Sequence, residues 1–164
     1  MMIDLPWHSW VPLWLMVPLF VAVAWTDLTE YRIPNLYCLI GVALFLVGSP
    51  ALGLHEVGLR LIAAGLCFGI CFALFAAGWL GGGDAKMLPV VFLAIPTQAL
   101  STYMLLLSAA MAFGLTSLTL LRLFVRQPTG KLAATLSGRE FPLGIAIGLS
   151  GLILAGWSML LYSA

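Results

Sequence analysis

The sequence predicts an all-α polytopic membrane protein with about six transmembrane helices, the fourth of them short. Of its 164 residues, 63% are hydrophobic and only 8% are charged, whereas a soluble domain carries about 25% charged residues. The mean hydropathy is +1.13, and apolar runs fill most of the chain. Because one spanning helix needs about 20 apolar residues, little length remains for a soluble domain. Residues 1–164 are therefore expected to form a single membrane-embedded domain.

The apolar runs follow one another at helical lengths. Five of them cover residues 7–26, 36–48, 59–80, 99–121 and 141–162, and a shorter fourth run lies at 87–95. His55 and Glu56 are assigned to a polar connection before the third run. A helix over 85–95 would cover only about 16 Å of a hydrocarbon core about 30 Å thick. This segment therefore either spans with local thinning or enters the membrane and returns.

The basic residues decide between these topologies. If the fourth segment spans, one side of the membrane receives six of the seven basic residues and the other receives Arg60 alone. The positive-inside rule assigns the richer side to the cytoplasm. Six spans with both termini outside are therefore predicted, and the first span is expected to be retained because no basic segment precedes it. The six residues are Arg32, Lys86, Arg122, Arg126, Lys131 and Arg139.

Two aspartates are predicted to reach the same membrane face. Asp27 ends the first span and Asp84 begins the fourth, so six spans place both at the cytoplasmic side. Carboxylates at membrane level are costly and indicate function. A pair permits aspartic-protease chemistry, in which one carboxylate activates water and the other, protonated, polarises a carbonyl. Asp84 could instead cap the following helix, whereas Asp27 ends its own helix, where the dipole opposes a negative charge, so capping does not explain it.

Glycines and charged residues flank these aspartates. Gly81, Gly82 and Gly83 precede the second aspartate with backbone that has no side chains, which would let an extended substrate chain approach closely. A flexible turn is the alternative. Glu30 could meet basic residues of a substrate, and Lys86 could interact with a carboxylate, but either could equally be a solvated charge at the membrane surface.

Two pairs of glycines are spaced four residues apart within apolar runs. The pairs are Gly65 with Gly69 and Gly144 with Gly148. Such spacing allows two helices to approach closely. Both pairs are interpreted as packing positions within the molecule.

The two aspartates lie in recognisable blocks. The segment Asp27-Leu-Thr-Glu-Tyr-Arg-Ile-Pro-Asn35, followed by Gly81-Gly-Gly-Asp-Ala-Lys86, resembles the two signature blocks of the type IV prepilin peptidases, which are GxGD membrane aspartyl proteases. The segment from Glu140 to Gly148 is similar to the final helix of that family. The resemblance covers nearly the whole chain. It implies a bacterial inner-membrane aspartic endopeptidase that cuts the basic leader of prepilins at the cytoplasmic face, with Asp27 and Asp84 as the catalytic pair.

The resemblance also indicates a subtype. Larger prepilin peptidases carry an added region with zinc-binding CxxC motifs and N-methylate their product. Cys38, Cys67 and Cys71 form no such motif and are interpreted as buried packing residues, so no metal, no other cofactor and no methyl transfer are expected. The compact chain is similar to the Tad/Flp-pilus type. This implies a Flp-like prepilin substrate, with the lipid bilayer and the pilus secretion machinery as further partners, and no nucleic acid.

Other classes of protein stay open. The nearest alternative enzyme is a GxGD protease of the presenilin or signal-peptide-peptidase type. A small transporter also carries acidic residues, although usually in mid-span, and a structural assembly subunit would tolerate the loss of both carboxylates. Replacement of either aspartate by asparagine distinguishes a protease from these two.

Overall fold

The structure, a computed structural model, describes residues 5–30, 32–124 and 143–163. All regular elements in these ranges are helical, which confirms the predicted all-α class. Three of them are short 3-10 helices, η1 (Trp7–Trp10), η2 (Ser49–Ala51) and η3 (Thr97–Ala99). The longer elements are α1 (Val11–Leu15), α2 (Val17–Glu30), α3 (Asn35–Gly48), α4 (Leu54–Ala76), α5 (Gly82–Ala94), α6 (Leu100–Phe124) and α8 (Leu143–Ser163).

The helix lengths confirm a polytopic membrane protein. Four segments are long and apolar enough to cross a membrane, at residues 7–30, 54–76, 97–117 and 143–163. A shorter apolar helix covers Asn35–Ala51. The fourth segment of the sequence forms α5, which has 13 residues and a length of about 20 Å. The count of six spans stays a prediction, because α3 and α5 are both shorter than the helices that cross a bilayer unaided.

The first apolar run lies within a candidate span at Trp7–Glu30. Its helix is interrupted after Leu15, because Pro18 has no N–H to donate to the carbonyl four residues earlier. One predicted boundary is wrong. His55 and Glu56 lie inside α4 and not in a connection. Glu56 is in the first turn of α4, where a negative charge is favourable, and it accepts a hydrogen bond from Arg60 one turn later.

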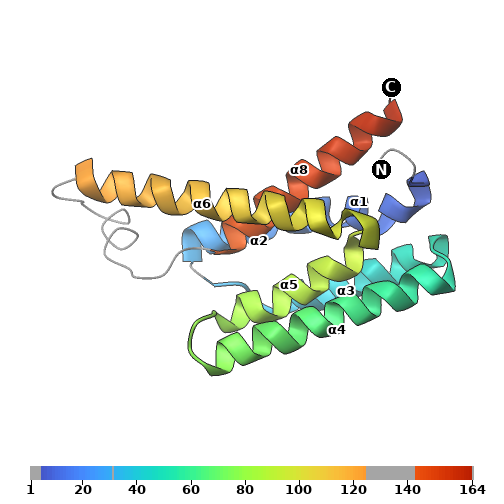
Figure 1. Cartoon of the computed structure of the whole chain (residues 1–164), viewed down its shortest axis with the longest axis horizontal. Helices are drawn as coiled ribbons and strands as arrows, with labels where there is room; N and C mark the ends of the chain where they lie inside the picture. Colours follow the sequence, from blue (N-terminus) through green and yellow to red (C-terminus); the bar gives the residue numbers. More distant parts are fainter. Residues whose placement is uncertain (1–4, 31, 125–142, 164) are drawn as a thin grey trace.

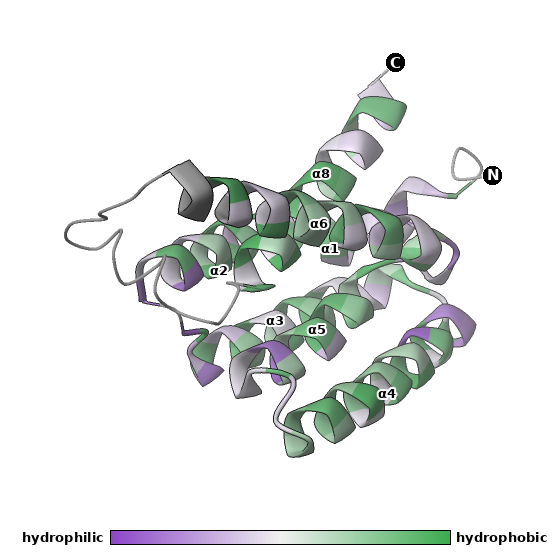
Figure 2. Cartoon of the chain, turned by 60° about the vertical axis from the view of Figure 1, so that its left-hand side comes forward, coloured by the Kyte–Doolittle hydropathy of each residue, from purple (hydrophilic) through white to green (hydrophobic). Residues whose placement is uncertain are grey.

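The helices form two groups, as Figure 1 shows. α2, α6 and α8 lie in one group and α3, α4 and α5 in the other, while α1 contacts members of both. The end of α2 and the starts of α3, α5 and α8 lie at one end of the molecule, and the two chain termini lie at the other. In Figure 2 the helix middles are mostly hydrophobic, and the hydrophilic residues concentrate near the helix ends. This distribution is typical of helices that pass through a bilayer.

The contact between α2 and α8 depends on glycines. A Cβ atom at Gly148 would lie 2.6 Å from the backbone oxygen of Phe20, and one at Gly151 would lie 2.7 Å from the Phe20 ring. Both distances are too short for a real contact. α8 therefore approaches α2 this closely only because these positions carry no side chain.

The two predicted glycine pairs have different outcomes. Gly144 and Gly148 face α2, which confirms their interpretation as packing positions. Gly65 and Gly69 lie on α4, and no described residue would come within 4 Å of a Cβ atom at either. The packing interpretation of that pair is wrong, because the spacing alone does not say which face of a helix meets a neighbour.

We expect Gly148→Ala to destabilise the protein by about 1–3 kcal/mol, because the added methyl group meets backbone that cannot move aside. Gly156→Ala is the matched control, since Gly156 lies on the same helix and a Cβ atom there meets no described residue within 4 Å. The free energy of unfolding in one detergent would be compared for the two variants. Equal effects would contradict this account of the α2–α8 contact.

Candidate active site

Asp27 connects the end of α2 to the start of α8. Its side chain lies in the last turn of α2, and the residue is 5% exposed. The Oδ2 atom accepts a hydrogen bond of 3.1 Å from the backbone N–H of Ile145, the third residue of α8, whose N–H has no partner within the helix. A Cβ atom at Gly144 would lie 2.8 Å from the Asp27 Cγ. The missing side chain of Gly144 therefore makes room for the carboxylate.

This contact corrects one step of the sequence argument. The sequence predicts no capping role for Asp27 because the residue ends its own helix, but its carboxylate lies at the amino end of a different helix, α8, where a negative charge is favourable. The two partners are 118 positions apart in the chain, so only the packing of α2 on α8 brings them together. Asp27 therefore has a structural role, whatever chemical role it also has.

Asp84 lies in the first turn of α5 and is half-buried. The sequence permits Asp84 as a possible cap of this helix. The N-cap residue of α5 is instead Gly81. A Cβ atom at Gly81 would lie 2.8 Å from Oδ2 of Asp84, and one at Gly83 would lie 3.0 Å from the Ile33 side chain. The carboxylate therefore lies against bare backbone, and the start of α5 packs closely on the link between α2 and α3.

Lys86 joins the two sequence blocks directly. Its Nζ donates a hydrogen bond of 3.0 Å to Oδ1 of Asn35, which is 51 positions away and begins α3. Lys86 ends the glycine-rich block and Asn35 ends the block that starts at Asp27. Both side chains also border a surface groove of about 400 Å³, which is lined further by Cys38, Leu39, Phe68, Pro89 and Val90.

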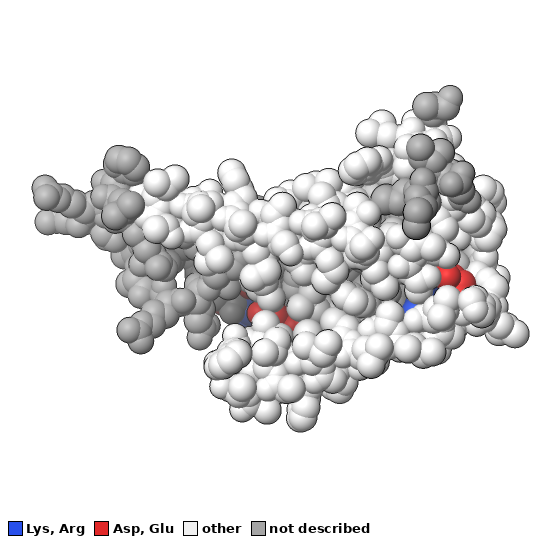
Figure 3. All heavy atoms as spheres, viewed as in Figure 1, with Lys and Arg blue, Asp and Glu red and all other residues white. Residues whose placement is uncertain are grey.

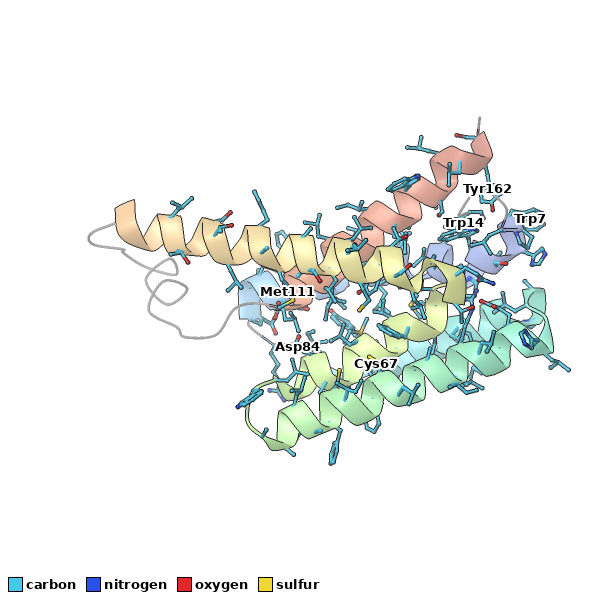
Figure 4. The ribbon with its side chains drawn as sticks, in the orientation of Figure 1. Trp7, Trp14, Cys67, Asp84, Met111 and Tyr162 are labelled. Carbon is cyan, nitrogen blue, oxygen red and sulfur yellow. The ribbon has the colours of Figure 1, made fainter. Side chains whose placement is uncertain are left out.

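The charged residues at this end of the molecule come from α2, α5 and the link after α2. Glu30 ends α2 and is exposed, as are Arg32 and Lys86. Figure 3 shows acidic and basic atoms together in a hollow between the two helix groups. In Figure 4, Asp84 lies well away from Trp7 and Tyr162, which mark the end with the chain termini. The structure thus gathers the residues singled out in the sequence at one end of the helices.

The cysteines fit their predicted role in part. Cys71 is buried, while Cys38 and Cys67 are half-buried. Cys67 and Cys71 lie one turn apart on α4, with their sulfur atoms 3.9 Å from each other. Among the described residues, no group of three His, Cys, Asp or Glu side chains is placed to hold a metal ion.

Sequence reasoning missed three partners of the charged residues. The Ile145 N–H and the Asn35 amide contact Asp27 and Lys86 across the fold, and no local pattern indicates either contact. Arg60, which the sequence treated only as a topology signal, forms an ion pair with Glu56 four residues earlier. That spacing puts two side chains on one helix face, so this pair could have been found.

Fold and site together define a helical membrane protein with two carboxylates at one end of its helices. A family model described as the type IV leader peptidase family matches residues 14–121, a range that includes both Asp27 and Asp84. The chain therefore belongs to the type IV leader peptidase family, as its resemblance to the prepilin peptidases indicated, and this family is one of peptidases. No curated protein and no solved structure gave a significant match.

The hydrogen bond from Ile145 predicts different stabilities for two variants of Asp27. Asp27→Ala leaves that N–H without its acceptor and is expected to lower the free energy of unfolding by about 1 kcal/mol. Asp27→Asn keeps an acceptor oxygen and should lower it less. Unfolding of both proteins in the same detergent checks this, and an asparagine variant as unstable as the alanine variant would contradict it.

Proposed function

We propose that this protein is an aspartic endopeptidase that removes the basic leader peptide from type IV prepilins of the Flp-like kind. Asp27 and Asp84 form the catalytic pair in this proposal. The observation that carries it is the direct contact between the two sequence blocks that hold these aspartates, through the hydrogen bond from Lys86 to Asn35. Membership of the leader peptidase family supplies the reaction class.

The proposed mechanism needs only water and the two carboxyl groups. One carboxylate removes a proton from a water molecule as the water oxygen attacks the scissile carbonyl carbon, and the other, protonated, donates to the carbonyl oxygen. The tetrahedral intermediate then breaks its C–N bond, and the amine leaves with a proton from the pair. Two neighbouring carboxylates share one proton because like charges at short range repel. The proposal therefore treats the pair as one unit and assigns neither aspartate as the base.

The surroundings of the two aspartates suit this chemistry. The carboxylate of Asp27 lies at the amino end of α8 and that of Asp84 at the amino end of α5, where helix dipoles stabilise the negative charge that the pair must carry. Asp27 is also shielded from solvent, and electrostatic interactions strengthen where water is excluded.

The substrate would run along the start of α5. Gly81 is exposed, and Gly82 and Gly83 are half-buried, so an extended leader would approach this backbone from its solvent side. The other side is filled by the protein's own side chains, because Cβ atoms at Gly82 and Gly83 would meet Phe75 and Ile33. Glu30 is exposed and negatively charged, which suits the basic residues of a leader. Lys86 donates a hydrogen bond to Asn35. In this proposal its main role is therefore to keep the two sequence blocks together, and a contact with substrate would be a second role.

We place the catalytic pair at the cytoplasmic face of the bacterial inner membrane. Arg32 and Lys86 lie at the same end as the pair, which the positive-inside rule assigns to the cytoplasm. Trp10 near one terminus donates a hydrogen bond of 3.2 Å to Tyr162 near the other, so both would lie on the periplasmic side. The absence of methyltransferase activity and contact with the pilus secretion machinery stay predictions. Arg126, Lys131 and Arg139 lie outside the described residues.

We expect Asp27→Asn and Asp84→Asn each to abolish leader cleavage, because neither amide can exchange the protons that the mechanism requires. The measurement is the cleaved fraction of a co-expressed Flp-type prepilin at matched membrane levels of enzyme. Asp4→Asn, the same change at the one other aspartate of the sequence, which is not a member of the proposed pair, serves as the control and should cleave like the wild type. Cleavage by either site variant within tenfold of the wild-type rate would overturn the catalytic pair.

The position of Glu30 predicts a charge-dependent change in substrate affinity. Glu30→Gln should raise KM for a basic leader about 1.4- to fivefold and leave kcat unchanged, because an exposed charge pair contributes about 0.2–1 kcal/mol. The difference should shrink at high ionic strength. Glu30→Asp, which keeps the charge, is the matched control. A KM equal to that of the wild type at low salt would remove Glu30 from the binding site.

A further inference from the structure

A second group of charged side chains lies at the opposite end of the molecule from the proposed catalytic pair, where Figure 3 shows another red and blue patch. Arg60 of α4 is completely buried there. Its Nε donates to Glu56 at 3.0 Å, and its Nη2 donates to the carbonyl oxygen of Ser9 at 2.7 Å. Its Nη1 donates to the carbonyl oxygens of Leu93 at 3.3 Å and Ala94 at 2.9 Å.

Glu56 extends this network to the start of η3. Its Oε1 accepts a hydrogen bond of 3.1 Å from the backbone N–H of Thr97, and its Oε2 accepts one of 3.1 Å from the Thr97 hydroxyl. The network therefore joins α4 to the end of α5, to η3 and to η1. A buried guanidinium is tolerated when its hydrogen bonds are made. Its removal would leave several buried acceptors without donors, which is expensive.

The hydrogen bonds from Arg60 constrain the position of α5 along its own axis, relative to the neighbouring helices. Leu93 and Ala94 are the last two residues of α5, and their carbonyl groups have no partner within the helix. The positive charge of Arg60 at this carboxyl end is also favourable. The other contacts of α5 with α3 and α4 are mainly apolar and close, with the Val90 side chain in the space that a Cβ atom at Gly41 would need. A slide of about 1.5 Å, the rise of one residue, would in addition break the bonds to Arg60.

The position of α5 decides the position of Asp84. Asp84 lies ten residues before Ala94 on the same helix, which is about 15 Å along the axis. A displacement at the end of α5 therefore moves Asp84 along that axis. Ser9, which accepts from the same guanidinium, belongs to the segment η1–α1 that leads into α2 and Asp27. Arg60 thus contacts both the helix that carries Asp84 and the segment that leads into the helix of Asp27.

We propose that Arg60 is a positioning residue that caps the end of α5, joins it to η1 and α4, and thereby sets the depth of Asp84 relative to Asp27. This inference rests on the proposed function, in which the two carboxylates act together. Arg60 touches neither substrate nor the reacting atoms, so its effect on the reaction passes entirely through the placement of α5.

The kinetic test compares Arg60→Met with Arg60→Lys. In Arg60→Met we expect kcat per folded enzyme to fall about 10- to 100-fold, since a misplacement of about 1 Å can have this effect, while KM stays within about twofold. Arg60→Lys keeps a cation and should recover part of kcat. Phe45→Ala, a change at a buried residue of α3 outside the network and the site, is the control for lost stability and should keep the wild-type kcat in its folded fraction.

A distance measurement gives a readout that does not depend on activity. Spin labels at Leu88→Cys, a half-buried position of α5, and Leu160→Cys, an exposed position of α8, would report the depth of α5 by double electron–electron resonance in a background without native cysteines. We expect Arg60→Met to shift or broaden the distance distribution and Phe45→Ala to leave it unchanged. Should Arg60→Met not fold, Thr97→Val replaces it, because it removes one bond to Glu56 and should give a smaller shift in the same direction.

The outcomes separate this inference from the proposed function. An unchanged distance distribution in Arg60→Met, or in Thr97→Val where that variant replaces it, overturns the positioning role, as does a wild-type kcat per folded enzyme in Arg60→Met. A shifted distribution with reduced kcat supports it. If Asp27→Asn and Asp84→Asn still cleave while the distance shifts, the catalytic pair fails but the placement of α5 by Arg60 stands.

Discussion

The short helix α5 is held by polar contacts at both of its ends, and the arrangement of the site depends on them. Lys86 binds Asn35 near the start of α5, and Arg60 binds the last two carbonyl groups at its end. In a bilayer, apolar surface has little preference between lipid and another helix, so hydrogen bonds and close packing decide how helices associate. α5 has 13 residues and packs closely on α4, and the few hydrogen bonds at its two ends add directional contacts to this apolar packing.

The pairing of α2 with α8 follows a different rule. Here glycines remove the side chains that would separate the backbones, and the Asp27 carboxylate closes the contact at the amino end of α8. The same carboxylate is one of the two that we propose for catalysis. Its surroundings therefore serve two purposes at once, because a group that stabilises a negative charge in the fold also stabilises it in a reaction.

Much of this could be predicted from particular residues. The apolar runs located each of the long helices, and the Asp27–Asn35 and Gly81–Lys86 blocks indicated which end of the bundle to examine. The errors have local causes. His55 and Glu56 looked like a connection because polar residues usually interrupt an apolar helix, but here Glu56 pairs with Arg60 inside α4. Gly65 and Gly69 have the spacing of a packing motif, yet helix spacing does not reveal which face meets a neighbour.

By itself the sequence determined the helical class, the membrane character and the family blocks, because hydrophobic periodicity and local motifs depend on residues that are near one another in the chain. Only the tertiary structure decided that Asp27 accepts a hydrogen bond at the amino end of α8 and that Lys86 donates one to Asn35. The same holds for the hydrogen bonds from Arg60 to the carbonyl groups of Ser9, Leu93 and Ala94. These partners are separated by tens of residues, and a polar side chain carries no local sign of which distant group will satisfy it. Burial forces Asp27 and Arg60 to find partners, and the packing of the helices selects which groups these are and also brings the exposed Lys86 beside Asn35.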